Sequence, residues 1–303
     1  MKKAHFGIFH VEPCRHEEYF FESLSFPYMD SYIINYWWDE TLCLRALQAC
    51  KAVGKTAWIS ISGLVFDVAA PSQMVDVNEG EDTDFQPGAY LKPDWKERIE
   101  HLMQTVRKAD AWEGFAGLYM DEPLLWGVTL EQFKEVTGYP RQRYPDKGFF
   151  VCFSIAGVAP DIWTTGNVQP ITADAGQYLT DVAYDMYHKF DKRYAYIARQ
   201  MKERLGNRAD LKVWYVPCTM DYRGDKDEQH CLDHLHGCYD LLKQEQNPGG
   251  LFCFSYHTFA AEEENLGNVG LEQLYDPAYK KYWPRLRTEI ERIGQEILTG
   301  SAC

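Results

Sequence analysis

The stretch GLYMDEPLLWG, residues 117–127, runs from an apolar segment directly into two carboxylic acids, Asp121 and Glu122. Its first half is typical of a buried β-strand, and Pro123 stiffens the backbone where that strand ends. Carboxylates at the mouth of a buried strand are unfavourable to desolvate, so they need a partner or a function. Whether these two acids have a partner or a function depends on the fold of the surrounding chain.

This stretch continues from the fourth of eight short β-rich runs, and segments with helical periodicity lie between the runs. The runs cover residues 4–11, 31–38, 55–62, 114–121, 148–156, 181–187, 211–217 and 250–256. Strands that alternate with amphipathic helices form a parallel sheet, and eight such units close into a (β/α)8 TIM barrel. We therefore predict an α/β fold with a single (β/α)8 barrel domain over residues 1–303. A doubly wound open sheet is the alternative, although no glycine-rich phosphate loop follows the first run.

Three of the intervening segments have a clear apolar face. Their apolar residues recur every three or four positions: Leu42, Ala46, Cys50 and Val53; Trp95, Ile99, Leu102 and Val106; Tyr279, Trp283, Leu286, Ile290, Ile293 and Ile297. Gly54 predicts the end of the first helix. Asp94 and Glu97 predict a capping box for the second, and Pro284 suits the first turn of the third.

The connection after the third run, from Gly63 to about Lys92, is much longer than the others. It is acidic, with NEGEDTD at residues 78–84. On a barrel this loop would lie on the catalytic face. Loops of this length serve as lids or are solvated excursions, and the sequence leaves both alternatives open.

The composition narrows the class of protein. A formal net charge of −14 argues against nucleic acid, because phosphate binding needs clustered Lys and Arg. The content of 46% hydrophobic and 25% charged residues is ordinary for a globular protein, and no run is long enough to span a membrane. The 9 cysteines include no C-x-x-C pair, so we interpret them as free, mostly buried thiols. The N-terminus lacks an apolar segment of signal-peptide length, so we expect a cytoplasmic protein.

Ligands of (β/α)8 barrels bind at the carboxyl ends of the strands, so the residues at those ends are candidates. The candidates for substrate binding are His10, Glu12, Asn35, Trp37, Trp38, Asp121, Trp126, Tyr187, His188, Tyr256 and His257. The catalytic candidates are Glu122, Asp185 and Asp221. Glycoside hydrolysis needs one protonated carboxylic acid and one carboxylate, while aromatic side chains contact the apolar faces of a sugar. The set predicts a site for a small-molecule carbohydrate, with no metal or cofactor required.

The segment GLYMDEP resembles the fourth-strand motif of clan A glycoside hydrolases, which have (β/α)8 barrels and end that strand in Asn-Glu-Pro. The match covers a few residues within one strand. In those enzymes the Glu is the acid/base, and the Asn binds a sugar hydroxyl next to the reacting carbon. The resemblance implies that Glu122 is the proton donor and that Asp121 is the hydroxyl-binding neighbour. Asp in place of Asn adds a charge, which we expect to raise the pKa of Glu122.

The second carboxylate departs from the family pattern. The family's nucleophile is a Glu that ends the seventh strand, and WYVPCTMDYRG at residues 214–224 has no Glu at that place. Asp221 lies slightly beyond the seventh run, and Asp185 ends the sixth. We predict that one of these two is the second carboxylate, and both retaining and inverting stereochemistry stay open.

Two alternatives to a glycosidase remain. A divalent metal, as in barrel isomerases and hydrolases, has suitable donors in His10, Glu12, Asp121, Asp185, His188 and His257. Against this, no H-x-H pair follows the first run. His230 and His234 lie one helical turn apart without the Glu of H-E-x-x-H, so we interpret them as surface histidines. The other alternative is a non-catalytic sugar-binding barrel. The sequence leaves the oligomeric state open.

Overall fold

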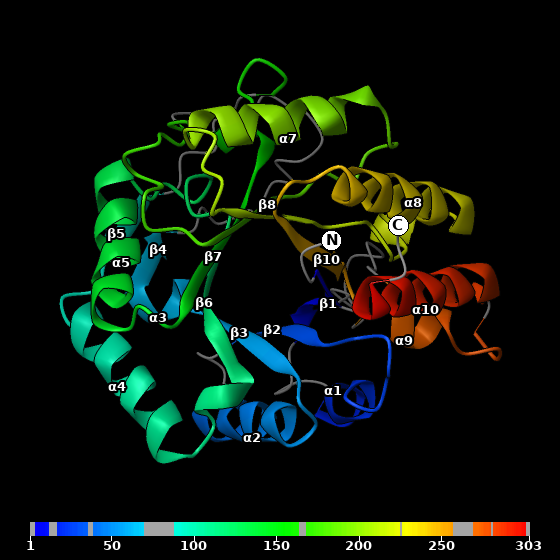
Figure 1. Cartoon of the computed structure of the whole chain (residues 1–303), viewed down its shortest axis with the longest axis horizontal. Coiled ribbons are helices and arrows are strands. Elements are labelled where there is room, and N and C mark those ends of the chain that lie inside the picture. The colour runs from blue at the N-terminus through cyan, green and yellow to red at the C-terminus, as the bar shows by residue number, and fades with distance from the viewer. Residues whose placement is uncertain are drawn as a thin grey trace.

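The structure is a computed structural model of the 303-residue chain. It describes residues 4–11, 17–35, 39–69, 88–163, 168–224, 226–256, 269–279 and 281–300. Eight parallel strands close into a barrel in the order β1-β10-β9-β8-β7-β6-β3-β2 (Figure 1). They are β1 (His5–Val11), β2 (Ser31–Asn35), β3 (Thr56–Ser60), β6 (Phe115–Asp121), β7 (Gly148–Phe153), β8 (Asp181–Tyr184), β9 (Lys212–Tyr215) and β10 (Pro248–Cys253). Each of the eight β-rich runs overlaps one barrel strand, so the predicted (β/α)8 fold is confirmed.

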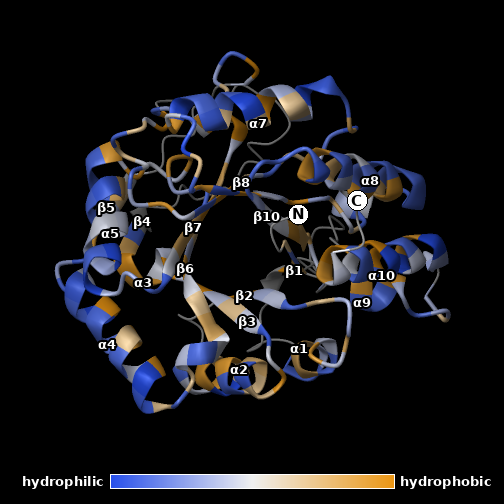
Figure 2. Cartoon of the chain, viewed as in Figure 1, coloured by the Kyte–Doolittle hydropathy of each residue, from blue (hydrophilic) through white to orange (hydrophobic). Residues whose placement is uncertain are grey.

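Helices surround the barrel (Figure 1). The longer ones are α1 (Glu17–Ser23), α2 (Glu40–Ala52), α4 (Trp95–Lys108), α5 (Leu130–Arg143), α7 (Lys192–Arg204), α8 (Glu228–Lys243) and α10 (Pro284–Thr299). Short helical segments are α3 (Ser62–Val65), η3 (Trp112–Gly114), α6 (Ile155–Val158), η4 (Tyr222–Gly224) and α9 (Leu271–Leu274). Figure 2 shows hydrophilic and hydrophobic residues mixed along the outer helices, as expected for amphipathic helices. Within the described ranges, no helix is long and apolar enough to cross a membrane.

The predicted helix ends are partly correct. Gly54 has a φ of +71° just after α2, which confirms the stop, and Pro284 is the first residue of α10. Val53 is 52% exposed because α2 ends at Ala52, so its assignment to the buried face was wrong. The capping box was also wrong, because the Asp94 side chain makes no cap and instead accepts a hydrogen bond from Arg98.

Aromatic rings from several strands pack together inside the barrel. Trp214 stacks on Phe252 with 4.5 Å between ring centroids, and on Phe150 with 5.5 Å. A Cβ atom at Gly249 would lie 2.2 Å from Nε1 of Trp214, so only glycine fits there. This packed layer supports the carboxyl ends of the barrel strands.

The amino-terminal end of the barrel has a cavity of its own, of about 430 Å³. Its lining includes strand-start residues such as His5, Asp181, Lys212 and Trp214. Because the strands are parallel, this cavity lies at the opposite end from Glu122.

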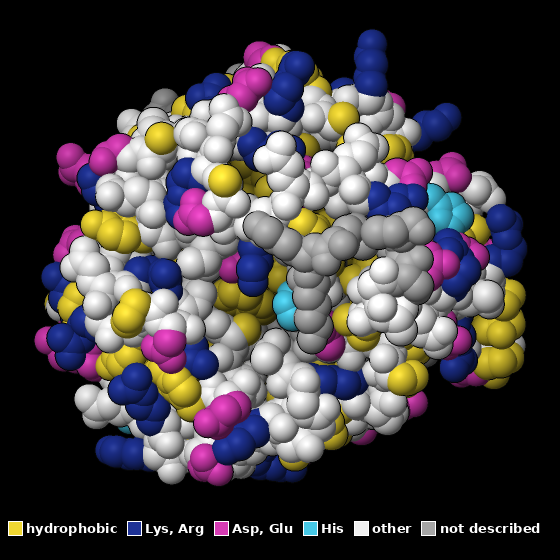
Figure 3. All heavy atoms as spheres, viewed as in Figure 1, with side chains coloured by type: hydrophobic (Ala, Val, Ile, Leu, Met, Phe, Trp, Pro, Cys, Tyr) yellow, Lys and Arg dark blue, Asp and Glu magenta, His cyan; other side chains and the backbone are white. Residues whose placement is uncertain are grey.

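Figure 3 shows one face of the molecule, with hydrophobic side chains near its centre and charged side chains spread around them.

Both ends of the long connection form secondary structure that the sequence did not predict. β4 (Phe66–Ala69) pairs antiparallel with β5 (Gly88–Leu91), with Phe66 opposite Leu91. Residues 70–87 lie outside the described part of the chain, so the choice between a lid and a solvated excursion stays a prediction.

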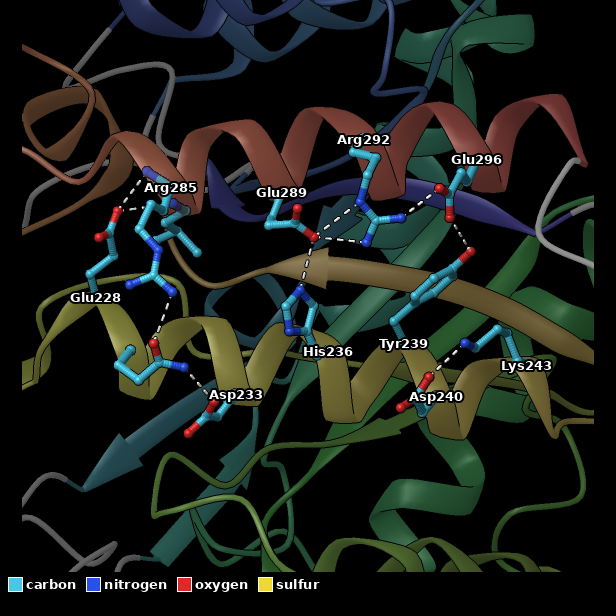
Figure 4. Close-up of polar contacts among 12 residues, drawn as sticks. Glu228, Asp233, His236, Tyr239, Asp240, Lys243, Arg285, Glu289, Arg292 and Glu296 are labelled. Atoms are coloured by element: carbon cyan, nitrogen blue, oxygen red, sulfur yellow. Dashed lines mark hydrogen bonds and ion pairs between the residues drawn. The ribbon is translucent and has the colours of Figure 1, made fainter.

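Helices α8 and α10 are joined by side-chain hydrogen bonds and ion pairs along their length (Figure 4). His236 bonds to Glu289 at 2.9 Å, and Arg292 bridges Glu289 and Glu296. The Tyr239 hydroxyl donates to Glu296 at 2.9 Å. Each exposed pair of this kind contributes at most about 1 kcal/mol, but together they fix α8 against the last helix.

The cysteines agree with the prediction. The seven that the structure describes are all free and buried: Cys43, Cys50, Cys152, Cys218, Cys231, Cys238 and Cys253.

Candidate active site

Asp121 and Glu122 lie at the carboxyl end of β6, as predicted. The backbone N–H of Glu122 donates to the Cys152 carbonyl at 2.8 Å, which extends the ladder with β7 by one residue. The Glu122 carbonyl then accepts from the N–H groups of Leu125 (2.9 Å) and Trp126 (3.2 Å), so the chain turns at this point.

The backbone of Glu122 is strained, with a φ of +42°. This left-handed conformation costs a residue with a Cβ atom roughly 1–2 kcal/mol, and such residues cluster at functional sites. In a regular strand, Asp121 and Glu122 would point to opposite faces of the sheet. The turn at Glu122 instead leaves its carboxyl group close enough to feel the charge of Asp121 and of Asp185.

Asp185 is the first residue after β8, and its N–H faces the Phe153 carbonyl at 3.3 Å. β6 and β8 both pair with β7, so the ends of these two alternate strands lie on either side of it. Side chains from alternate strands of a barrel point into the same layer. This geometry explains why acids that are 63 positions apart in the sequence meet.

The carboxyl groups of Glu122 and Asp185 are close enough for each to shift the pKa of the other, and both residues are half-buried. Burial raises the pKa of Glu122 well above its usual value, and the charges of Asp185 and Asp121 raise it further. The expected effect of Asp121 is therefore confirmed, although it is the smallest of these three. Burial and Asp121 also raise the pKa of Asp185, to about 7, while Tyr187 and Glu122 act against this shift.

Two carboxyl groups this close share a proton at neutral pH, since both cannot ionise without strong repulsion. Oε1 of Glu122 and Oδ1 of Asp185 are buried and have no hydrogen-bond partner among the described residues. Buried polar atoms are nearly always satisfied, and a proton held between the two carboxyl groups would satisfy both.

Two neighbours of the pair were missed by the sequence analysis. Tyr119 is fully buried, and its hydroxyl donates to Oδ1 of Asp121 at 2.6 Å. The two-residue spacing on one strand was the available signal. Cys152 on β7 is fully buried, and its pKa is raised by burial and by Asp185, Asp121 and Glu122.

Asp221, the other candidate for the second carboxylate, is paired with a lysine. Its side chain is 1% exposed, Lys281 Nζ lies 2.5 Å from its Oδ2, and the N–H of Lys226 donates to its Oδ1 at 3.1 Å. Asp221 is not among the groups that shift the pKa of Glu122 or Asp185. In this geometry the Asp221 carboxylate is paired with Lys281.

Apart from Asp121, the predicted substrate-binding residues fall into three groups. Tyr187 stacks on Phe254 (4.9 Å between centroids) beside Asp185, and Trp126 and His188 are half-buried. Tyr256 is 3% exposed and packs edge-on against Phe26, which makes it a core residue here. The side chains of the others lie outside the described residues: His10, Glu12, Asn35, Trp37, Trp38 and His257.

The interpretation of the α8 histidines as surface residues was wrong for His234, which is 0% exposed, and His230 is half-buried. His234 lies on the helix face that also carries Cys231, Leu235 and Cys238, all of which are buried. That spacing predicts an inward-facing position. In the described part of the chain, no three His, Cys, Asp or Glu side chains are arranged to hold a metal ion. The side chains of three donors of the metal alternative are outside that part: His10, Glu12 and His257.

The sequence matches no protein-family model and no curated protein. Among solved structures it is similar to a GH5_18 protein from Bifidobacterium longum subsp. infantis, with a TM-score of 0.57 and 11% identity over 98% of this chain and 79% of that one. An α-amylase from Lactobacillus plantarum gives a TM-score of 0.53 and 10% identity, with the same coverage of 98% and 79%. A calcium-binding mutant of Bacteroides uniformis β-glucuronidase 2 gives 0.53 and 13% over 88% of this chain, which spans 32% of the glucuronidase chain.

These similarities are to barrel structures from glycoside hydrolases. At 10–13% identity these similarities show the fold alone, and the (β/α)8 barrel that the resemblance of GLYMDEP implied is confirmed.

Proposed function

We propose that the protein is a glycoside hydrolase in which Glu122 is the general acid and Asp185 is the second carboxylate. The observation that carries this proposal is the pair of half-buried acids at the carboxyl ends of β6 and β8, whose pKa values are both raised. Hydrolysis of a glycosidic bond needs a protonated acid and an ionised carboxylate at the same moment. Two neighbouring acids with different pKa values supply both, once the bound sugar separates their carboxyl groups by the roughly 5–9.5 Å that this chemistry needs.

The two pKa shifts suit different roles, with Glu122 as the proton donor and Asp185 as the ionised carboxylate. The pKa of Glu122 is raised further by the charge of Asp185, so Glu122 keeps the proton while Asp185 ionises near pH 7. Glu122 then donates its proton to the departing glycosidic oxygen. Asp185 attacks the anomeric carbon or activates the attacking water.

The remaining side chains are proposed to bind the sugar. Asp121, oriented by the hydroxyl of Tyr119, would accept a hydrogen bond from the hydroxyl next to the reacting carbon. Tyr187 and Trp126 would contact its apolar faces. Three carboxyl groups in one site disfavour an anionic sugar, so we propose a neutral glycoside or oligosaccharide as the substrate.

The test is a panel of aryl α- and β-glycosides with wild type, Glu122→Gln and Asp185→Asn, each with and without EDTA. We expect each substitution to lower kcat by about 10²–10⁴-fold. Phenyl glycosides need a proton on the leaving oxygen, whereas dinitrophenyl glycosides need little help. Glu122→Gln should therefore lose much more activity on phenyl than on dinitrophenyl substrates, and Asp185→Asn should lose similar activity on both.

Asp221→Asn is the matched control, because it makes the same substitution at a buried aspartate paired with Lys281. Its activity per folded molecule should stay close to that of wild type. Full activity in Glu122→Gln contradicts the proposal. Activity that EDTA abolishes supports the metal alternative, and sugar affinity without turnover supports the binding alternative.

A further inference from the structure

The loop between β8 and α7, residues 185–191, carries Asp185, Tyr187 and His188. Its backbone is held by Tyr194 of α7. The buried Tyr194 hydroxyl lies 2.7 Å from the Met186 carbonyl and 2.9 Å from the His188 carbonyl. These carbonyls flank Tyr187 and follow directly after Asp185.

His234 of α8 binds the same loop. Its Nδ1 accepts from the N–H of Cys218 at 3.1 Å, so the proton of the neutral ring is on Nε2. Nε2 donates to the His188 carbonyl at 3.0 Å and also contacts the Tyr194 hydroxyl. Burial and His230 lower the pKa of His234 to about 3, so the ring stays neutral. His234 thus connects the loop after β8 to the segment after β9.

The packing leaves the loop little room. Phe190 stacks on Tyr194 with 4.4 Å between centroids and meets the ring of His234 edge-on at 5.9 Å. A Cβ atom at Gly237 of α8 would lie 2.3 Å from the Phe190 ring. Because α8 is itself fixed against α10 (Figure 4), the loop is confined between α7 and α8.

We propose that Tyr194 and His234 are positioning residues that hold the 185–191 loop so that the Asp185 carboxyl group faces Glu122. This inference rests on the proposed function. Neither residue reaches the reacting groups, since both bind backbone carbonyls behind Asp185. Displacement of a catalytic group by about 1 Å can lower the rate by about 100-fold, which is the effect expected when the loop is released.

Two substitutions at His234 separate positioning from stability. The amide nitrogen of His234→Gln replaces Nε2 and keeps the bond to the loop, while it loses the bond to Cys218. The amide oxygen of His234→Asn replaces Nδ1 and keeps the bond to Cys218, while it loses the bond to the loop. His234→Gln loses the one hydrogen bond of Nδ1, and His234→Asn loses the contacts of Nε2 with the His188 carbonyl and the Tyr194 hydroxyl, so rates are compared per folded molecule.

The kinetic result should differ between the two variants. We expect kcat of His234→Asn to fall by about 100-fold, with a much smaller change in KM, and kcat of His234→Gln to stay near that of wild type. Tyr194→Phe keeps the packed ring and removes only the hydroxyl, and it should lower kcat in the same way. Equal losses of kcat in the Gln and Asn variants would overturn the proposal, as would an unchanged kcat in both His234→Asn and Tyr194→Phe.

A second readout does not depend on activity. Carbon-13 NMR of labelled aspartate carboxyls follows the titration of Asp185, whose pKa of about 7 reflects its burial. Release of the loop should lower this pKa in His234→Asn and leave it unchanged in His234→Gln. If wild type hydrolyses no glycoside, the proposed function fails, and the NMR titration still decides the positioning: an unchanged Asp185 pKa in His234→Asn overturns it.

Discussion

Replacing Asp185 by asparagine should make the protein more stable above neutral pH. The pKa of Asp185 is raised from 3.8 to about 7 in the folded state, chiefly by burial. Between these two values the unfolded chain releases the proton while the folded chain retains it. The stability that this group contributes is therefore fully present below pH 3.8 and is lost as pH rises through about 7.

The size of the effect follows from the two pKa values. Each tenfold change in proton affinity is worth about 1.4 kcal/mol, so the difference between 3.8 and about 7 corresponds to about 4 kcal/mol. Asparagine has nearly the same shape and carries no charge, so Asp185→Asn removes this loss. It also removes the charge that raises the pKa of Glu122, which acts in the same direction.

The assay is urea unfolding followed by circular dichroism at pH 4 and pH 8. We expect wild type and Asp185→Asn to have similar free energies of unfolding at pH 4, and the variant to be more stable by up to about 4 kcal/mol at pH 8. Asp221→Asn is the matched control with the opposite sign, because it breaks the contact with Lys281 and should destabilise by about 1–3 kcal/mol. An Asp185→Asn protein that is no more stable than wild type at pH 8 would refute the reasoning.

Three further outcomes are expected. The rate of hydrolysis should rise through about pH 7 as Asp185 ionises and fall at higher pH as Glu122 loses its proton; a pH–rate profile that is flat from pH 5 to 9 contradicts this. Tyr119→Phe removes the 2.6 Å hydrogen bond to Asp121 and should lower kcat/KM by about tenfold, measured against an unchanged far-ultraviolet spectrum. Gly237→Ala should lower the free energy of unfolding by about 1–3 kcal/mol, because the added methyl group meets a phenylalanine ring at 2.3 Å; unchanged chemical denaturation would show that the loop has room to move.

The sequence alone does not separate Asp185 from Asp221 as the candidate for the second carboxylate. Both acids follow a β-rich run, and both are followed by polar residues, so local pattern does not separate them. The difference is made by Lys281, which lies 60 positions away and approaches Asp221. An ion pair between distant segments leaves no periodic trace in the sequence, so only the folded chain distinguishes the two.

His234 shows a different kind of failure. The spacing of Cys231, Leu235 and Cys238 placed it on the buried face of α8, but its polar side chain favoured an exposed position. The structure resolves this conflict because Cys218 and His188 satisfy both ring nitrogens. A buried polar residue is predictable only when its partners are known.

By itself, the sequence determined the eight strands, their alternation with helices, and the presence of Asp121 and Glu122 at the end of the fourth run. These features depend on hydrophobic periodicity and turn residues, which act over a few positions. The tertiary structure alone decided that Asp185 lies close to Glu122, and that Tyr194 and His234 bind the loop that follows β8. Those contacts arise from the closure of the barrel, which joins segments far apart in the chain and removes water from their carboxyl groups.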